Sequence, residues 1–282
     1  MKQQQIEILV SEFCASDRNT LELPSGEPAW GSPLFGYARG DDPLFEKIKD
    51  DIGSFYWTPL EAFRLAYPNE PVSASELSVI SYLLPQTEAT RKEQRINTEL
   101  PGERWARSRY YGEAFNRDLR CYLADELSRQ GYLAVAPERL PAFAYQSSSA
   151  FGIASNWSER HTAWVAGLGT FGLSDGLITR AGKAVRFGSV VARIALAPTT
   201  REYEGHQDWC LWYARGTCGA CMKRCPVAAI SERGHDKDAC CTFIRTVTAP
   251  YVDKTFGTGD TPCGLCQVKI PCEARSPLHP PV

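Results

Sequence analysis

Cysteine is the residue type whose number and placement carry most of the chemistry in this sequence. The chain has 282 residues and 11 cysteines, of which Cys14 and Cys121 stand alone. The other nine crowd into the last third of the chain: Cys210, Cys218, Cys221, Cys225, Cys240, Cys241, Cys263, Cys266 and Cys272. The odd count and the lack of an export signal argue against a disulfide scaffold, so we expect reduced thiolates that bind metal. We expect the two lone cysteines to be small core residues.

The first half of this region is the segment TCGACMKRCPVAAI (217–230). Two residues separate Cys218 from Cys221, three separate Cys221 from Cys225, and a proline follows. The spacing resembles the run C-x2-C-x2-C-x3-C-P of bacterial ferredoxins without its first cysteine. Arg215 stands where that cysteine would be. One cluster is therefore expected to have an unusual fourth ligand.

The second half is CGLCQVKIPCE (263–273), and the adjacent pair Cys240 and Cys241 lies between the halves. A 4Fe-4S cubane needs four thiolates that converge on its corners, and glycine-rich turns let one loop supply two or three of them. Two cubanes need eight ligands, so nine cysteines leave one spare. The alternative is a structural zinc site, because two C-x2-C pairs can make a four-thiolate zinc centre.

The whole C-terminal text, together with ERHTAWVAGLGTFGLSDGLIT (159–179), resembles the cobalamin-dependent epoxyqueuosine reductases and reductive dehalogenases. The resemblance covers most of the chain and is strongest from about Asn156 onward. It implies an α/β (α+β) fold with a nitroreductase-like domain over residues 1–200. A ferredoxin-like domain with two 4Fe-4S clusters would follow over residues 201–282.

The resemblance also implies two crossed sets of ligands. One cluster would take Cys225, Cys240, Cys263 and Cys266, where Cys240 is preferred over Cys241 because the text CCTFI matches the family pattern. The other cluster would take Cys218, Cys221 and Cys272. Its fourth corner is left to Cys210, to a non-cysteine group or to solvent. An open iron corner would be a Lewis acid that could bind substrate.

Cobalamin is the further cofactor that the resemblance raises. The glycine-rich turn with Gly167, Gly169 and Gly172 resembles the family segment that packs beside the corrinoid, and these glycines would let backbone approach a cofactor. Two departures argue against cobalamin: Ile153 replaces the Asp general acid of epoxyqueuosine reductases, and Phe115 stands where a His is expected. The same turn is a weak match to a nicotinamide fingerprint, since no strand precedes it.

The segment WARSRYY (105–111) supplies the candidates for catalysis. Arg109, Tyr110 and Tyr111 could donate a proton or bind an anion near the cofactor. The competing interpretation is a helix start whose aromatic residues anchor it to the core.

The elements that must position these residues follow from hydrophobic periodicity. The run ELSVISYLL (76–84) predicts a buried strand, and apolar residues at helical spacing predict a helix over 113–130 that ends at Gly131. A strand is expected at 132–137, a helix from Asn156 or Ser158, and a hairpin built around Gly182. The polar stretch 199–208 predicts the domain boundary.

Composition limits the classes of function. With 31 Lys and Arg against 33 Asp and Glu, no strong field would recruit nucleic acid or a membrane surface. No apolar run is long enough for a membrane span, and we expect a cytoplasmic protein. The sequence thus favours an iron–sulfur oxidoreductase that takes electrons from ferredoxin, flavodoxin or a similar donor and acts on a small molecule. The alternative is a non-catalytic electron carrier or redox sensor.

Overall fold

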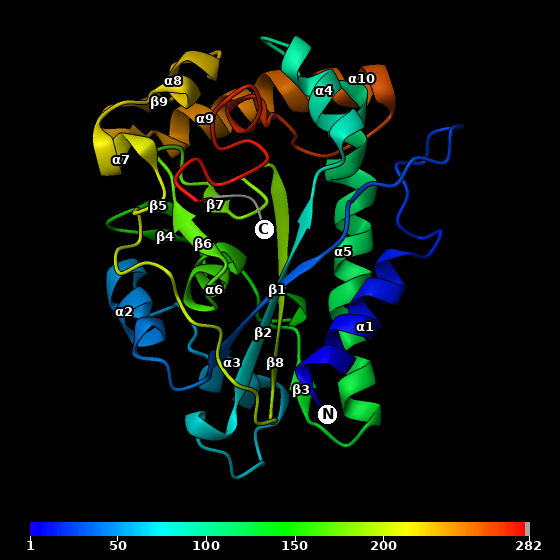
Figure 1. Ribbon diagram of the computed structural model, residues 1–282, viewed down its shortest axis with the longest axis vertical. Helices are drawn as coiled ribbons and strands as arrows, with labels where there is room; N and C mark the ends of the chain where they lie inside the picture. Colours follow the sequence, from blue (N-terminus) through cyan, green and yellow to red (C-terminus); the bar gives the residue numbers. More distant parts are fainter. Residues whose placement is uncertain (280–282) are drawn as a thin grey trace.

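A four-stranded antiparallel sheet forms the centre of the computed structural model, which describes residues 1–279 (Figure 1). The strand order is β1-β2-β8-β3, with β8 between β2 and β3. The bounds are Leu34–Arg39 for β1, Ser78–Pro85 for β2, Ala134–Val135 for β3 and Val185–Ala192 for β8. The predicted strand at 76–84 is confirmed as β2, whose first seven residues are all buried.

Helices cover both faces of this sheet, so β2 and β8 have no polar side to present to water. On one face lie α1 (Gln3–Cys14) and the long α5 (Glu103–Arg129), and on the other lie α2 (Pro43–Ile52), α3 (Pro59–Ala66) and α6 (Glu159–Val165). Figure 1 shows the two helical layers on either side of the strands. Each layer buries its own apolar cluster against the sheet.

The predicted helix at 113–130 is confirmed as part of α5, which begins ten residues earlier than expected. The earlier start was hidden because its first turns are rich in arginine and aromatic residues instead of regularly spaced aliphatic ones. The helix expected from Ser158 is confirmed as α6, with the Ser158 side chain capping its first turn. The strand expected at 132–137 is reduced to the two residues of β3.

The hairpin predicted around Gly182 is wrong in its pairing. β7 (Leu177–Thr179) pairs with β6 (Gly169–Phe171), whereas β8 pairs with β2 and β3 in the central sheet. The chain turns at Gly182, where φ is +81°, and this turn sends β8 away from β7. Period-two alternation locates strands but does not name their partners.

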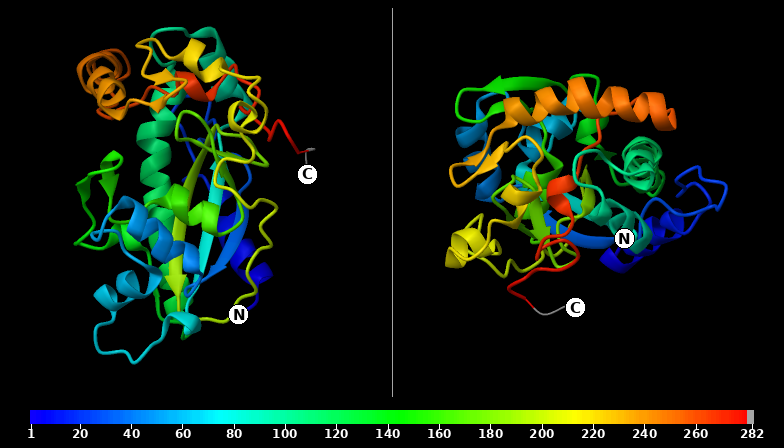
Figure 2. Two further views of the ribbon diagram at one scale, coloured as in Figure 1. Left: turned by 90° about the vertical axis from the view of Figure 1, so that its left-hand side faces the viewer. Right: turned by 90° about the horizontal axis from the view of Figure 1, so that it is seen from above.

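The cysteine-rich region lies at one end of the molecule, beside α4 (Glu88–Ile96). Its elements are short: α7 (Leu211–Arg215), α8 (Ala220–Arg224), β9 (Ile230–Ser231), β10 (Gly234–His235), α9 (Lys237–Phe243), a π-helical turn (Ile244–Thr248), α10 (Ala249–Phe256) and a 3-10 turn (Leu265–Gln267). The other views show α9 and α10 crossing this end, with a separate hairpin of β4 (Tyr145–Ser148) and β5 (Gly152–Ser155) at the side (Figure 2). Within the described part of the chain, no helix is long and apolar enough to cross a bilayer.

Candidate metal centre and the neighbouring polar network

Eight of the nine C-terminal cysteines lie in two groups of four. Cys210, Cys218, Cys221 and Cys272, here called the Cys272 group, line one cavity. Cys225, Cys240, Cys263 and Cys266, here called the Cys263 group, lie within electrostatic range of one another. The family resemblance implied the same two sets. Cys210 lies beside the three cysteines whose fourth partner the resemblance did not identify. Ligation itself stays a prediction.

Burial and repulsion from neighbouring thiols raise the pKa values of four of these cysteines, Cys221, Cys240, Cys263 and Cys272. Burial, followed by neighbouring thiols, raises the pKa of Cys263 to about 12 and the pKa of Cys240 to about 11. Burial likewise raises the pKa of Cys272 to about 12, although Lys183 opposes it. A bound iron cluster would reverse this balance, because a metal cation deprotonates the thiols that coordinate it.

No group of three or more His, Cys, Asp or Glu side chains within residues 1–279 is placed to hold a single metal ion. A cubane distributes four thiolates over four irons, so its ligands do not have to meet at one point. The donor set of each group, four cysteines, is the set that a 4Fe-4S cluster uses. The residues present therefore fit two such clusters.

Tight turns bring the cysteines of each group together. Gly219 (φ +136°) follows Cys218 at the start of α8, and Gly264 (φ +67°) follows Cys263. A Cβ on Gly264 would lie 2.0 Å from the Trp105 ring of α5, so only glycine fits between that ring and the cysteine loop. The Gln94 amide of α4 fixes the same loop by donating to the Cys263 carbonyl over 2.7 Å.

Lys183 is a buried cation that lines the cavity of the Cys272 group and lies near Cys266 of the Cys263 group. Its side chain is 4% exposed and donates to the Ser174 hydroxyl. Burial opposes its charge, but thiols of both groups, Cys266 and Cys272 first, raise its pKa above the usual value. Thiolate-bound clusters are anionic, so an ammonium at this place would offset part of their charge.

Cys210 and Arg215, which stands where the first ferredoxin cysteine is missing, lie at the two ends of α7. Cys210 precedes α7 and is buried, whereas Arg215 ends α7 and is exposed. Cys241 sits beside Cys240 in α9 and also lies within electrostatic range of it, so the choice of Cys240 over Cys241 as a ligand stays a prediction. Cys14 is buried in the core between α1 and α5, and Cys121 lies on α5, both outside the two groups.

The three glycines predicted to approach a cofactor have local reasons to be glycine. Gly167 (φ +83°) lies just beyond the C-terminal cap of α6, and a Cβ on Gly169 would lie 2.0 Å from the Ile178 carbonyl oxygen across the β6–β7 pair. A Cβ on Gly172 would lie 3.1 Å from the Ile178 side chain. Turn geometry and strand packing thus account for all three, and their predicted role toward a cofactor stays a prediction.

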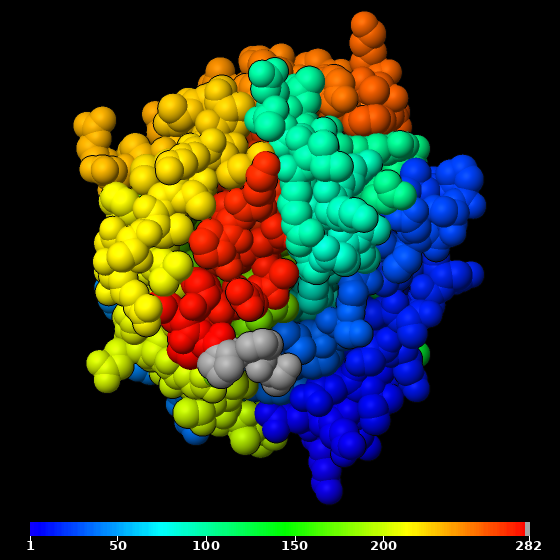
Figure 3. All heavy atoms as spheres, turned by 45° about the horizontal axis from the view of Figure 1, so that its top comes forward, coloured from blue at the N-terminus to red at the C-terminus, as the bar shows by residue number. Residues whose placement is uncertain are grey.

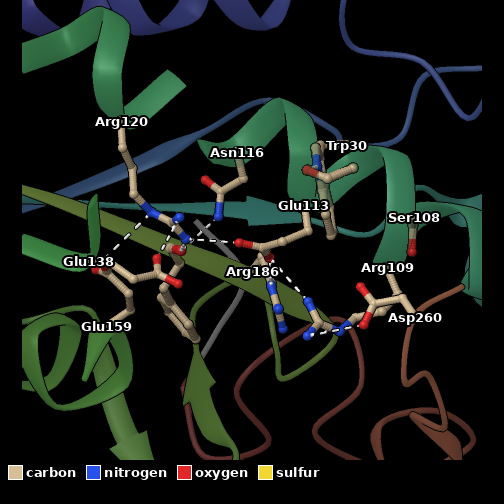
Figure 4. Close-up of polar contacts among 12 residues, drawn as sticks. Trp30, Ser108, Arg109, Glu113, Asn116, Arg120, Glu138, Glu159, Arg186 and Asp260 are labelled. Atoms are coloured by element: carbon tan, nitrogen blue, oxygen red, sulfur yellow. Dashed lines mark hydrogen bonds and ion pairs between the residues drawn. The ribbon is translucent and has the colours of Figure 1, made fainter. Parts of the chain in front are cut away.

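The three catalytic candidates of α5 point to different surroundings. Tyr110 is exposed and meets Tyr111 edge-on, with ring centroids 4.9 Å apart. Arg107 lies over the Tyr111 ring. Arg109 instead joins a network of charged residues between α5, β8 and the cysteine-rich region (Figure 4).

Glu113 is the centre of this network. Its carboxylate is 3.1 Å from Arg120 Nη2 and 3.4 Å from Arg109 Nη1, and it also accepts the Nε–H of Arg186. Although burial opposes ionisation, the three arginines, Arg186 first, lower the pKa of Glu113 to about 2. Arg109 also lies 3.7 Å from Asp260, three residues before Cys263.

At the other end of the network, Arg120 is 2.5 Å from Glu138 and 3.6 Å from Glu159. Burial raises the pKa of Glu159 to about 8; Arg120 opposes this shift and Glu138 adds to it. The pKa values of Glu113 and Glu159 are therefore shifted in opposite directions, that of Glu113 downward and that of Glu159 upward. Such separation of pKa values is common where proton transfer is organised.

Sequence reasoning missed this network, although a signal was present. Four polar residues of α5 recur at spacings of four, three and four residues, which places them on one face of the helix: Arg109, Glu113, Asn116 and Arg120. The adjacent face carries the apolar stripe that identified the helix. Phe115, expected to be a His in the family, belongs to that apolar face and packs against Phe13 with ring centroids 5.2 Å apart. Ile153 is a partly exposed residue of β5.

No family model and no curated protein matches this sequence. Among solved structures, a catabolic reductive dehalogenase in complex with 3-bromo-4-hydroxybenzoic acid superposes with a TM-score of 0.55 at 15% identity, over 97% of this chain and 36% of that chain. A second reductive dehalogenase, described in terms of B12-dependent dehalogenation, superposes with a TM-score of 0.51 at 16% identity. This match covers 83% of this chain and 29% of that chain. An epoxyqueuosine reductase with a modified tRNA stem loop superposes with a TM-score of 0.50 at 15% identity. This match covers 98% of this chain and 68% of that chain.

These likenesses establish the fold: the chain has the mixed α/β fold of reductive dehalogenases and epoxyqueuosine reductases. It spans about a third of the length of the reductive dehalogenases that it matches.

Proposed function

We propose that this chain is an iron–sulfur oxidoreductase that holds two 4Fe-4S clusters and reduces a small molecule. The Cys272 group would bind one cluster, with Cys210 as its fourth ligand, and the Cys263 group would bind the other. When bound, such clusters carry single electrons, which a ferredoxin, flavodoxin or similar protein would supply. The proposed units are residues 1–200 and 201–282.

The observation that supports the proposal is that eight cysteines fall into two groups of four, with members of both groups within electrostatic range of one buried lysine, Lys183. The Gly264 turn and the Trp105 ring position one group, and the backbone beside Lys183 positions the other. The charged network of Figure 4 favours an enzyme over a simple electron carrier, because a carrier needs no recessed carboxyl groups whose pKa values are shifted in opposite directions.

Cobalamin is not part of the proposal. The glycines predicted for it are explained by turn geometry, and the position of the family's expected His is taken by a core phenylalanine. A corrinoid absorption band in the purified protein would add cobalamin to the proposed cofactors.

The test is anaerobic purification followed by iron and sulfide analysis. We expect about eight irons and eight sulfides per chain, falling to about four of each in Cys272→Ala and in Cys210→Ala, because each variant loses one cluster. Cys241→Ala is the matched control and should keep about eight. About one zinc with no iron would overturn the proposal, and unchanged iron in Cys210→Ala would remove that residue as a ligand.

If both clusters are present, the enzyme and carrier alternatives separate by turnover. An enzyme consumes a small molecule in the presence of reduced donor. A carrier only passes its electrons to an acceptor protein.

A further inference from the structure

Three arginines near the cysteine groups have charge and hydrogen-bonding capacity that the protein does not use. They are Arg109 of α5, Arg160 of α6 and Arg186 of β8, here called the arginine group. Arg186 donates Nε–H to Glu113, and Arg160 donates from Nη1 to the Asp175 carbonyl oxygen over 2.5 Å. Among residues 1–279, both terminal nitrogens of Arg186 and the Nη2 of Arg160 make no hydrogen bond.

These side chains remain within reach of solvent. Arg109 is 28% exposed, Arg186 is 35% exposed, and Arg160 is exposed. Yet protein surrounds Arg160 closely enough that loss of water lowers its pKa, and the positive charge of Arg186 lowers it further. The pKa of Arg109 is lowered chiefly by Arg186. Like charges that repel one another are stabilised when an anion binds beside them.

The carboxylates beside the arginine group are shared among several cations. Glu113 is shared by Arg109, Arg186 and Arg120, and Asp260 approaches only Arg109. Asp175 lies within electrostatic range of Arg160, but it also pairs with His235 and faces Lys237. Arg120 is paired with Glu138 on the far side of Glu113, as Figure 4 shows. The free donors therefore belong to the part of the network where Glu113 and Asp175 each serve more than one cation.

The arginine group also lies close to the candidate metal centre. Arg186 is three residues beyond Lys183, a separation of about 10 Å along an extended chain. The exposed ring of Tyr145, on the β4–β5 hairpin, lies within electrostatic range of both Arg109 and Arg160. A molecule held here would have fixed cations on one side and an aromatic side chain near them.

We infer that the arginine group binds an oxyanion of the substrate, a carboxylate or a phosphate, and so orients the substrate toward the cysteine groups. Guanidinium groups suit this task because their N–H donors match the geometry of both anions. The inference rests on the proposed function for its account of why a substrate binds here. The binding itself can be measured without turnover.

The experiment is isothermal titration calorimetry of the anaerobically purified chain, at constant ionic strength set with chloride. Inorganic phosphate is titrated in one arm and benzoate in the other, which separates the two anion chemistries. We expect saturable binding of at least one probe. Arg160→Gln and Arg186→Gln should each weaken it about ten-fold or more, because each removes a charge-assisted hydrogen bond.

Arg193→Gln is the matched control. Arg193 follows β8, is 36% exposed and pairs with Glu76, so it resembles Arg186 in burial and pairing but lies at the other end of the strand. Its substitution should change the affinity less than two-fold. No saturable binding of either probe, or an equal loss in Arg193→Gln, would overturn the inference.

Iron analysis of the same samples separates this inference from the proposed function. About eight irons with no anion binding would reject the arginine site alone. Anion binding that depends on Arg160 and Arg186 in a chain without iron would reject the cluster proposal and leave the arginine site standing.

Discussion

Glu159 is the residue whose protonation is most strongly tied to folding. In the unfolded chain a glutamate has a pKa of about 4.3, whereas burial beside Glu138 raises the pKa of Glu159 to about 8 in the folded chain. Between these values the folded state binds the extra proton. The contribution of Glu159 to stability is therefore greatest at low pH and is lost as the pH rises toward 8.

Glu159→Gln should remove this pH dependence, because a glutamine mimics the protonated side chain at every pH. We expect the free energy of unfolding, measured by anaerobic urea titration, to fall less steeply between pH 6 and pH 8 than in the unmodified chain. The difference in slope is at most about 1.4 kcal/mol per pH unit. Glu126→Gln, which changes a helix-surface pair with Arg129, is the control. Equal slopes in all three proteins would contradict the assignment.

At the scale of elements, the turn before β8 determines where Cys272 lies. The amides of Lys183 and Ala184 donate to the Cys272 and Glu273 carbonyl oxygens over 2.8 to 3.0 Å. A Cβ on Gly182 would lie 2.3 Å from the Glu273 carbonyl oxygen, which is backbone and cannot rotate away. Gly182→Ala should therefore push the Cys272 loop outward.

The expected result for Gly182→Ala is loss of about half of the bound iron, measured after anaerobic purification. Gly131→Ala is the control, because Gly131 has a similar φ of +85° but nothing lies within 4 Å of its added Cβ. That variant carries the backbone strain without the displacement, so it should keep its iron. If both variants retain iron equally, the contact between the turn and the loop does not position the cysteine.

The same elements show how far sequence alone could predict this molecule. A continuous apolar run located β2, and apolar residues at helical spacing located α5. Cysteine spacing located the region of the candidate metal centre. The pairing of β8 with β2 and β3 was not predictable, because hydrogen-bond partners depend on contacts distant in sequence. The ion pairs of the polar face of α5 were not predictable either, because their partners, Arg186 of β8 and Asp260 of the C-terminal region, are distant in sequence.

At the scale of the whole molecule, α4 fastens the cysteine-rich region to the rest of the chain. Figure 3 shows α4 beside the C-terminal segments on the outer surface. Arg91 and Arg95 of α4 are shared by two glutamates: Glu88 of the same helix and Glu273, the neighbour of Cys272. Arg95 Nη2 lies 2.6 Å from Glu273 Oε1 and Arg95 Nη1 lies 2.8 Å from Glu88 Oε1.

Burial decides which of the two glutamates matters more for stability. The Glu273 side chain is 7% exposed and that of Glu88 is 60% exposed, so Glu88 is solvated whether or not it is paired. Glu273→Gln keeps the shape but leaves two arginines facing an uncharged group, and we expect a loss of about 1–3 kcal/mol in the free energy of unfolding. Glu88→Gln should cost less than about 1 kcal/mol. Anaerobic urea unfolding measures both, and iron release to a chelator should be faster in Glu273→Gln alone. An equal effect of the two substitutions would show that α4 does not fasten the cysteine-rich region through Glu273.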